Sequence, residues 1–294
     1  MIRVLLFFLL TCSLSVLAEG PAEVRFLAYN LENYIRSVPE GSRPVEPKSE
    51  KSIAALIAVI ASEKPDIIGV CEMGAPAEFE DFLTRLKAAG LDFPHTEYVQ
   101  AADLERHVAL ASRFPISARH SQTNLSFDLI GKKQYYKRGI LDVTIDVTAT
   151  CQLHFIGTHL KSKRDVPEDE SLVRRGEAHL LRLHCKSILE KTPDARMLVY
   201  GDFNDTINEA SIREIMGRKN SDDALRPVDL RDVNGDKWTH YWKTADIYSR
   251  IDYVLTSRAA TQDVIAEKSH IPRPANWYEA SDHRPLVVVL RVRP

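Results

Sequence analysis

Apolar residues are distributed along this chain in two patterns, and each pattern predicts one kind of secondary structure. Short, nearly continuous apolar runs are typical of strands that are buried on both faces. Apolar side chains that recur every three or four positions are typical of helices that cover such a sheet. The predicted strands cover Val24–Asn30, Asp66–Glu72, Val108–Ser112, Ile140–Val147, Leu153–Leu160, Met197–Tyr200, Ile251–Thr256 and Leu286–Leu290.

Three stretches have the spacing of amphipathic helices. The first places four aliphatic side chains on one face: Ile53, Leu56, Ile57 and Ile60. The second has an apolar stripe that ends before Gly90: Phe79, Phe82, Leu83 and Leu86. The longest runs from Glu168 to Glu190 and opens on acidic residues, which suit the positive end of a helix dipole. It is predicted to turn four side chains inward: Leu172, Leu180, Leu183 and Ile188.

The order of these elements predicts the fold class. The strands between positions 108 and 160 follow one another without helices, which favours antiparallel pairing, whereas helices separate other strands. Because sheets and helices must both cover an apolar face, a layered α/β sandwich follows. The sequence has no glycine- and serine-rich linker and no repeat, so residues 19–294 are predicted to form a single domain.

The first 18 residues have the pattern of a secretory signal peptide and predict export to the periplasm or the medium. Arg3 supplies the positive start, Val4–Leu10 the apolar segment, and Ala18 the small residue before a mature start at Glu19. The apolar segment is short for a transmembrane anchor, and no other stretch is predicted to enter a membrane. A lipoprotein attached through Cys12 is disfavoured, because a threonine precedes this cysteine.

Composition and charge narrow the function classes. The chain is 44% hydrophobic and 27% charged, which is ordinary for a globular protein. Without residues 1–18 it keeps 38 of its 39 basic residues against 41 acidic ones, so bulk charge does not attract polyanions. Three cysteines remain in the mature chain. Cys71 and Cys151 lie in apolar runs typical of buried cysteines, and a Cys151–Cys185 disulfide stays open.

Polar side chains recur where the predicted strands end or begin. Five of them close a strand: Asn30, Glu72, His159, Asp202 and Asn204. Three others open one: Asp252, Asp282 and His283. The start of an antiparallel strand lies beside the end of its neighbour, so all of them can share one rim. Singly, each is explained by turn chemistry; together they supply the carboxylates, amides and imidazoles of a metal-dependent phosphoryl-transfer site.

The chemistry of phosphodiester cleavage explains these residue types. Oxygen ligands from Asn30, Glu72 and Asp282 suit Mg²⁺, with Mn²⁺ or Ca²⁺ as alternatives. A bound cation would neutralise phosphate charge, and a carboxylate would orient or deprotonate the attacking water. A histidine suits contact with the phosphoryl oxygens, in particular when a carboxylate fixes its tautomer.

Eight segments that carry these residues resemble the endonuclease/exonuclease/phosphatase superfamily. They occur in the family's order: FLAYNLEN, PDIIGVCEM, ALASRFPI, KRGILDV, GTHLKSK, VYGDFND, SRIDYVL and ASDHRPLVV. Any one segment is a weak match, but the ordered set covers nearly the whole mature chain and is highly specific. The resemblance implies a four-layer sandwich, with two mixed β-sheets packed face to face and helices outside, and metal-dependent phosphodiester hydrolysis.

The resemblance implies metal-binding and phosphate-binding roles for four residues. Glu72 corresponds to the main metal ligand, and Asn30 to a residue that positions the metal or the nucleophile. Asp282 corresponds to a carboxylate on the metal side. Arg138 in KRGILDV is predicted to reach a phosphate oxygen, with a surface salt bridge as an equal alternative.

Five further residues correspond to the family's catalytic groups. Asp202 resembles the residue that orients the attacking water, and Asn204 resembles its partner at the phosphate. His283 corresponds to the histidine that contacts the scissile phosphate, oriented by Asp252. His159 resembles a second histidine, which is present in some branches of the family and replaced in others.

The substrate is less well specified than the reaction. GDFND is followed by Thr206, and SRIDYVL replaces the segment typical of inositol phosphatases, which favours the nuclease branches. DNA or RNA is therefore the predicted substrate, hydrolysed by a monomer without a protein partner. A phospholipid, as in sphingomyelinases, or a small phosphoester is the alternative, and a non-catalytic binding homologue ranks third.

Two further sets of side chains could contact a substrate. Lysines interleave with Tyr135 and Tyr136, and Lys161 follows His159 closely, in a pattern that can bind strands of nucleic acid. Ordinary solvated loops are the commoner interpretation of such lysines. The segment Ala275–Tyr278 is a faint candidate for a hydrophobic lipid-binding loop, and no clear aromatic-rich loop of that kind is found.

Overall fold

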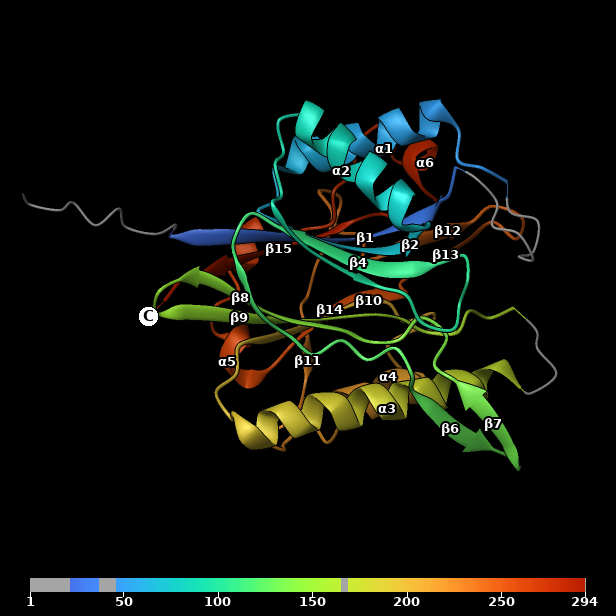
Figure 1. Cartoon of the computed structure of the whole chain (residues 1–294), viewed down its shortest axis with the longest axis vertical. Coiled ribbons are helices and arrows are strands. Elements are labelled where there is room, and N and C mark those ends of the chain that lie inside the picture. The colour runs from blue at the N-terminus through green and yellow to red at the C-terminus, as the bar shows by residue number, and fades with distance from the viewer. Residues whose placement is uncertain (1–21, 37–45, 165–168, 294) are drawn as a thin grey trace, which may run out of the picture.

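Two β-sheets packed face to face form the centre of the computed structural model, which describes residues 22–36, 46–164 and 169–293 (Figure 1). The first sheet has the strand order β15 (Leu286–Arg291), β1 (Glu23–Tyr34), β2 (Ile67–Met73), β4 (His107–Ser112) and β3 (His95–Val99). The second has the order β11 (Arg226–Pro227), β14 (Asp252–Thr256), β10 (Met197–Asp202), β9 (Cys151–His159), β8 (Leu141–Thr148) and β5 (Ile116–Arg119).

Each sheet contains one parallel pair of strands among antiparallel neighbours. Strands β1 and β2 run parallel and are connected through helix α1 (Glu50–Glu63). Strands β9 and β10 also run parallel and are connected through helix α3 (Glu170–Lys191). The other neighbours in both sheets are antiparallel. The predicted mixed, mostly antiparallel sheets are therefore confirmed.

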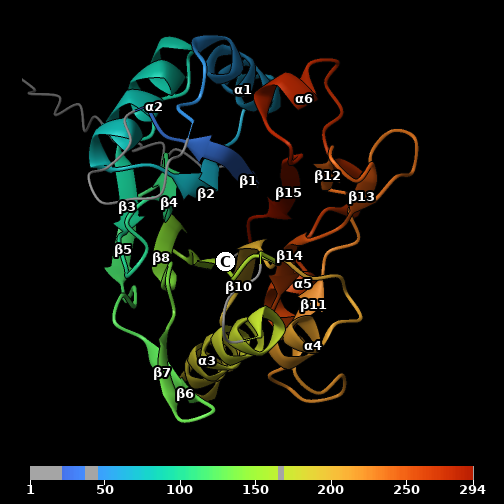
Figure 2. The ribbon, with the colours of Figure 1, turned by 90° about the vertical axis from the view of Figure 1, so that its right-hand side faces the viewer.

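Helices cover the outer face of each sheet and complete four layers. Helices α1, α2 (Pro76–Ala88) and α6 (Trp277–Ala280) lie over the first sheet, and α3 and α4 (Ala210–Met216) lie over the second (Figures 1 and 2). One apolar cluster fills the space between the sheets, and two others fill the spaces under the helices. This arrangement confirms the predicted four-layer sandwich.

Aromatic rings and two glycines fix the distance between the sheets. The ring of Phe26 lies 4.9 Å from the rings of Phe155 and Tyr200 across the interface. A Cβ atom added at Gly69 would lie 2.2 Å from the Tyr200 ring, and one added at Gly157 would lie 2.6 Å from its hydroxyl. Tyr200 therefore has room only because Gly69 on the opposite sheet and Gly157 on the adjacent strand lack side chains.

Two short hairpins project from the sandwich and were not predicted from the sequence. The first pairs β6 (Ser126–Leu129) with β7 (Lys132–Tyr135) beside helix α3. The second pairs β12 (His240–Trp242) with β13 (Ile247–Ser249). Helix α5 (Arg258–Thr261) and a 3₁₀ helix (Ala266–Lys268) precede the last strand. These elements are too short to produce a periodic pattern.

The inward face predicted for the long helix is wrong for Leu172 and Leu183, whereas Leu180 and Ile188 are partly buried against the core below the helix. Leu172 and Leu183 are 37% and 48% exposed. The side chains that α3 buries are Val173, Arg174, Glu177, Ala178, Leu181, Arg182, Cys185 and Leu189. Arg174 donates to Asp205, and Glu177 accepts from the Lys161 backbone N–H. The buried face of α3 therefore includes charged side chains, which a search for apolar spacing does not detect. The predicted start at Glu168 lies outside the described residues.

The cysteines and the N-terminal segment complete the comparison with the sequence. Cys71, Cys151 and Cys185 are buried and unpaired in the described part of the chain, so a Cys151–Cys185 disulfide is not formed. The predicted signal peptide, residues 1–18, and its Cys12 lie outside the described residues. Within the segments that the structure describes, no helix has both the length and the apolar character needed to cross a membrane.

Candidate active site

Three predicted catalytic residues lie side by side at one end of the second sheet. Asp202 is in register with His159 of the parallel strand β9 and with Asp252 of the antiparallel strand β14. Gly201 has a φ of +137°, and a Cβ atom there would lie 1.8 Å from the carbonyl oxygen of Thr158. A glycine before Asp202 is therefore required by the close approach of β9 and β10.

The first sheet brings Asn30 and Glu72 to the same rim through irregular strand ends. Strands β1 and β2 change register after Asn30, and β2 changes register against β4 after Val70. Four residues around the rim have positive φ although they are not glycine: Glu32, Asn33, Glu72 and Asn204. Bulges and left-handed residues re-aim side chains at the ends of strands and are common at functional sites.

A single carboxylate oxygen connects the two sheets. Asn30 Nδ2 donates a hydrogen bond to Asp202 Oδ2 at 3.0 Å. The Nε2 atoms of His159 and His283 lie 3.6 Å and 3.8 Å from the same oxygen. Asn30, His159, Asp202 and His283 are all at most 5% exposed. The structure thus brings together residues that lie up to 253 positions apart in the sequence.

The two histidines have opposite electrostatic environments. Burial lowers the pKa of His159, and the nearby Arg138 guanidinium lowers it further, so this imidazole is neutral. Burial also acts against a charged His283, but Asp252, Asp282 and Asp202 outweigh it and raise the pKa of His283 well above its ordinary value. His283 Nδ1 lies 2.8 Å from Asp252 Oδ2, the orientation that the sequence predicted.

Asp202 and Asn204 are fixed by hydrogen bonds within their own turn. Burial and the Asp252 carboxylate raise the pKa of Asp202, and the charge of His283 partly offsets this. Asp202 Oδ1 accepts a hydrogen bond from the Asn204 backbone N–H at 2.8 Å. Asn204 Nδ2 donates to the carbonyl oxygen of Leu160 at 3.0 Å, which ties β10 to the loop after β9.

Acidic side chains crowd the part of the rim that faces the first sheet. Glu72 Oε2 accepts a hydrogen bond from the Asn33 backbone N–H at 3.0 Å. Glu32 Oε2 accepts one from the backbone N–H of Asp282 at 3.2 Å and lies 3.5 Å from Lys48 Nζ. Burial, followed by the charge of Asp282, raises the pKa of Glu32. Closely spaced carboxylates with an amide oxygen nearby are a donor set that fits Mg²⁺.

Glu32 and His240 belong to the site and were missed by the sequence analysis. Glu32 stands two positions after Asn30 in FLAYNLEN, where a bulge turns it toward Asp282. His240 Nε2 lies 3.7 Å from Asp282 Oδ2, and the His240 backbone forms an isolated bridge to His283. Glu32 could have been found from the sequence, because it is an acidic residue two positions after the predicted ligand Asn30 in FLAYNLEN. No periodic or strand-end signal marks His240.

Arg138 lies near the site but is paired with a carboxylate. Its Nε atom is 2.9 Å from Asp103 Oδ2, and both side chains are nearly buried. The sequence suggested either a phosphate contact or a surface salt bridge for Arg138. The structure contains a salt bridge, but it is buried. The charge of Arg138 still reaches His159, whose pKa it lowers.

Two residues of the predicted basic and aromatic surface are buried instead. Tyr136 is fully buried and its hydroxyl contacts the Thr158 hydroxyl. Lys161 is 7% exposed, and its Nζ atom donates to the carbonyl oxygens of Ser162 and Arg164. Burial lowers the pKa of Lys161 to about 8. The turn after β9 folds back on itself, so an exposed lysine pattern was the wrong interpretation at this position.

An aromatic patch lies beside His283, although the sequence showed only a faint candidate for one. It combines the β12–β13 hairpin with the segment around α6 and consists of Trp238, Tyr241, Trp242, Tyr248, Trp277 and Tyr278. Tyr241 stacks on Tyr248 with a centroid distance of 4.4 Å, and Trp238 contacts Trp277 at 5.0 Å. Trp242, Tyr248 and Tyr278 are 54%, 52% and 42% exposed. Residues more than 30 positions apart form this patch, which hides it from a search for one loop.

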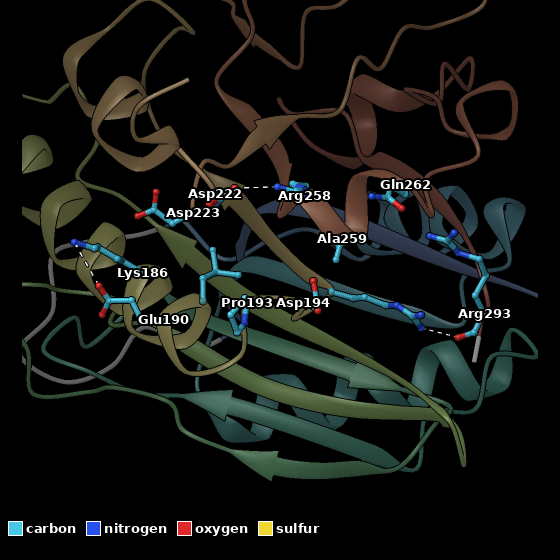
Figure 3. Close-up of a pocket in the computed structure, with 12 residues that line it drawn as sticks. Lys186, Glu190, Pro193, Asp194, Asp222, Asp223, Arg258, Ala259, Gln262 and Arg293 are labelled. Carbon is cyan, nitrogen blue, oxygen red and sulfur yellow. Dashed lines mark hydrogen bonds and ion pairs between the residues drawn. The ribbon is translucent and has the colours of Figure 1, made fainter. Parts of the chain in front are cut away.

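A cavity of about 800 Å³ lies at the opposite ends of the central strands (Figure 3). Its lining includes Asp194 and Arg196, which precede β10, and Arg258, which follows β14. These positions are at the far ends of the strands that carry Asp202 and Asp252. Arg258 forms an ion pair with Asp222 at 2.9 Å, so charges in this cavity compensate one another.

Comparisons with known proteins agree with this geometry. The sequence pattern described as the Endonuclease/Exonuclease/phosphatase family matches residues 27–283. The chain is similar to the endonuclease/exonuclease/phosphatase from Bacteroides vulgatus, with 16% identity, a TM-score of 0.64, and coverage of 93% of this chain and 100% of that chain. A search of curated proteins found no match.

Two further solved structures have the same fold. The human nocturnin catalytic domain has 16% identity and a TM-score of 0.63, and the match covers 92% of this chain and 95% of that chain. Sphingomyelinase C from Streptomyces griseocarneus has 14% identity and a TM-score of 0.60, with coverage of 92% and 99%. At these identities the likeness shows the fold alone.

Proposed function

Since this chain belongs to the endonuclease/exonuclease/phosphatase family, whose members are generally hydrolases of phosphoester bonds, we propose that it is a divalent-metal-dependent phosphodiesterase that cleaves nucleic acid. The observation that carries the reaction class is the environment of Asp202 Oδ2. This oxygen accepts a hydrogen bond from Asn30 and faces the Nε2 atoms of a neutral His159 and a cationic His283. Paired groups with opposed proton states are typical of acid–base chemistry.

The side chains have complementary tasks in the proposed reaction. Asp202, with its raised pKa, orients the attacking water and accepts its proton. His283, held by Asp252, donates from Nε2 to a phosphoryl oxygen as charge develops there. His159 provides a second, neutral donor, and Asn204 keeps the turn of Asp202 in place while contributing to the phosphate contact.

A divalent cation would be held by oxygen ligands on the first-sheet side of the rim. The residues that fit this role are Asn30, Glu32, Glu72 and Asp282, of which Glu32 adds to the set predicted from the sequence. The observation that supports the fit is the position of Glu32 beside Asp282, because Glu32 Oε2 accepts the Asp282 backbone N–H at 3.2 Å and two oxygen-bearing side chains of the set are thus neighbours. When bound, the cation supplies charge neutralisation at the phosphate and the leaving oxygen.

Nucleic acid is the proposed substrate because of the β6–β7 hairpin, which leads directly into Arg138. Its exposed residues include Lys132, Lys133 and Tyr135. Lys133 Nζ lies 5.3 Å from the centre of the Tyr135 ring. Exposed aromatic rings with adjacent cations can stack bases and attract the phosphate backbone. Together with the export predicted from residues 1–18, the proposed activity is that of an extracellular or periplasmic nuclease.

A phospholipid phosphodiesterase is the second candidate, and the aromatic patch favours it. Trp242 and Tyr248 expose amphipathic rings on the hairpin that His240 bridges to His283, Tyr278 exposes one on α6, and Ile247 is 49% exposed on the same hairpin. Tryptophan and tyrosine are suited to the boundary between water and lipid. The two candidates share the reaction and the catalytic residues, and they differ in which hairpin contacts the rest of the substrate.

One substrate panel tests the proposal. Purified protein with Mg²⁺ or Mn²⁺ is incubated with DNA, RNA, bis-(p-nitrophenyl) phosphate and sphingomyelin. Hydrolysis of DNA or RNA is expected, and hydrolysis of sphingomyelin alone would transfer the proposal to the second candidate. His283→Ala should reduce kcat about 10²- to 10³-fold, whereas His179→Ala on the exposed side of α3 should not. If the protein hydrolyses none of the four substrates, the proposal that it is a phosphodiesterase is refuted.

A further inference from the structure

A second imidazole lies directly beside that of His283 and shares its carboxylate neighbour. The ring centroids of His240 and His283 are 4.6 Å apart. His240 Nε2 lies 3.7 Å from one oxygen of Asp282, and His283 Nε2 lies 3.8 Å from the other. The three potential ligand atoms all lie within 4.8 Å of one another. We propose that these three residues form a binding site for a transition-metal cation such as Zn²⁺, which inhibits the enzyme.

Both imidazoles are oriented as metal-ligating histidines usually are. His283 Nδ1 lies 2.8 Å from Asp252 Oδ2, and His240 Nδ1 lies 3.3 Å from the Ser249 hydroxyl. A ligating histidine almost always donates its other N–H to a carboxylate, a backbone carbonyl or water, which fixes the tautomer and the ring plane; for His240 the Ser249 hydroxyl occupies this place. In both residues Nε2 is the nitrogen that faces Asp282, and a cation that binds His283 there displaces the Nε2 proton to solvent.

The backbone holds the three residues in this arrangement before any cation binds. His240 and His283 form an isolated β-bridge, and the Tyr241 backbone N–H donates to the carbonyl oxygen of Asp282 at 2.9 Å. Nitrogen and oxygen ligands about 2.0–2.2 Å from a tetrahedral zinc ion are about 3.4 Å apart. The two histidine nitrogens lie 3.7 Å and 3.8 Å from different oxygens of Asp282, and one ligand atom from each residue lies within 4.8 Å of the others, so side-chain rotations must bring the atoms to this spacing.

The donor atoms select a different cation from the one proposed for catalysis. Two imidazole nitrogens and one carboxylate suit Zn²⁺ and its neighbours, whereas Mg²⁺ requires oxygen ligands. Asn30, Glu32 and Glu72 would supply oxygen ligands to the catalytic cation, and Asp282 belongs to both donor sets. One half of the rim therefore carries only oxygen ligands, and the other, the nitrogen-containing half, carries the imidazoles of His240 and His283.

Occupation of the nitrogen-containing half inhibits hydrolysis, a consequence that rests on the proposed function. His283 Nε2 cannot bind a cation and donate to a phosphoryl oxygen at the same time. Zn²⁺ therefore removes the donor that the reaction requires, even while Mg²⁺ remains available. The binding itself depends only on His240, Asp282 and His283 and does not require that the protein be an enzyme.

Calorimetric titration of Zn²⁺ into metal-free protein tests the binding. The variant His240→Phe keeps an aromatic ring against His283 and removes the ligand atom. It should weaken Zn²⁺ binding at least about tenfold, since loss of even an outer-shell partner has an effect of this size. His179→Phe, which removes an exposed imidazole from α3, is the matched control and should bind Zn²⁺ as the wild type does. Equal affinity in wild type and His240→Phe would overturn the site.

Two further measurements separate this inference from the proposed function. Co²⁺ added to the wild-type protein should produce the visible absorption of a nitrogen-ligated, low-coordination site, and its absence would overturn the site whether or not a variant folds. In turnover assays with Mg²⁺, the Zn²⁺ concentration for half inhibition should rise at least about tenfold in His240→Phe. Zn²⁺ binding without hydrolysis would reject the proposed function alone, whereas hydrolysis with unchanged inhibition in His240→Phe would reject the inhibitory site alone.

Discussion

Asp252→Asn tests whether one carboxylate sets the charge of His283. Asp252 Oδ2 lies 2.8 Å from His283 Nδ1, and both side chains are 7% exposed. Asparagine has the same size and keeps an oxygen that can accept the Nδ1 hydrogen bond, so the packing of the pair is preserved. The substitution removes the negative charge that contributes most to raising the pKa of His283.

The expected loss of stability depends on pH, and its sign follows from the raised pKa. A charged His283 that is paired in the folded protein contributes stability fully below the unfolded pKa of about 6.5. This contribution disappears as the pH rises through the raised folded pKa. A hydrogen bond to a charged group contributes about 1.5–3 kcal/mol, so Asp252→Asn should lose about 2 kcal/mol near pH 6. The loss should shrink at alkaline pH.

Urea unfolding of metal-free protein at several pH values measures this difference. A parallel assay with Mg²⁺ should show a decrease of about 10²- to 10³-fold in kcat, because the phosphate loses a cationic donor. Asp263→Asn is the matched control, since Asp263 is a buried aspartate that accepts a hydrogen bond from Arg293 far from the site. It should lose stability and retain kcat. A stability loss that is the same at acidic and alkaline pH would refute the reasoning.

Three other predictions address the backbone, a structural anchor and the metal. Gly201→Ala should lower the free energy of unfolding by about 3 kcal/mol or more in urea titrations, because its Cβ would meet the Thr158 carbonyl oxygen at 1.8 Å with φ at +137°; wild-type stability would contradict this. Arg284→Lys should lose at least about 2 kcal/mol, because the buried guanidinium stacks 3.4 Å from the centre of the Trp238 ring and pairs with Asp232; a thermal melt checks it. Chelation should abolish hydrolysis, and Mg²⁺ at about 100 times its Kd should stabilise the folded protein by about 2.7 kcal/mol; an unchanged melting temperature would argue against the metal site.

The fold could be predicted because its main signals are local. Strands such as Asp66–Glu72 are continuous apolar runs between polar residues, and the observed strand, Ile67–Met73, differs by one residue at each end. The helix face of α3 was misjudged because Arg174 and Glu177 are buried through specific partners. Arg174 donates to Asp205 at 2.8 Å, and Glu177 accepts from the Lys161 backbone N–H at 2.6 Å. A pattern of hydrophobicity cannot anticipate such pairs.

The same distinction applies to the candidate site. His159, Asp202 and Asp252 were predictable because each stands at the end of a regular strand, and sheet register then places them side by side. Glu32 reaches Asp282 through a bulge, and His240 reaches it through a bridge formed by a three-residue strand. Those contacts depend on tertiary geometry that has no local periodicity.

Reaction class and substrate choice are therefore encoded in different parts of the structure. The groups proposed for catalysis lie on the two central parallel pairs and their neighbours, where strand register leaves little freedom. The groups proposed to contact the rest of the substrate lie on the β6–β7 and β12–β13 hairpins, which join the sandwich at its edges. Changes in a hairpin can alter the exposed lysines or aromatic rings without moving Asp202. In the proposed function, a rim fixed by strand register is therefore compatible with hairpins that suit either a nucleic acid or a lipid substrate.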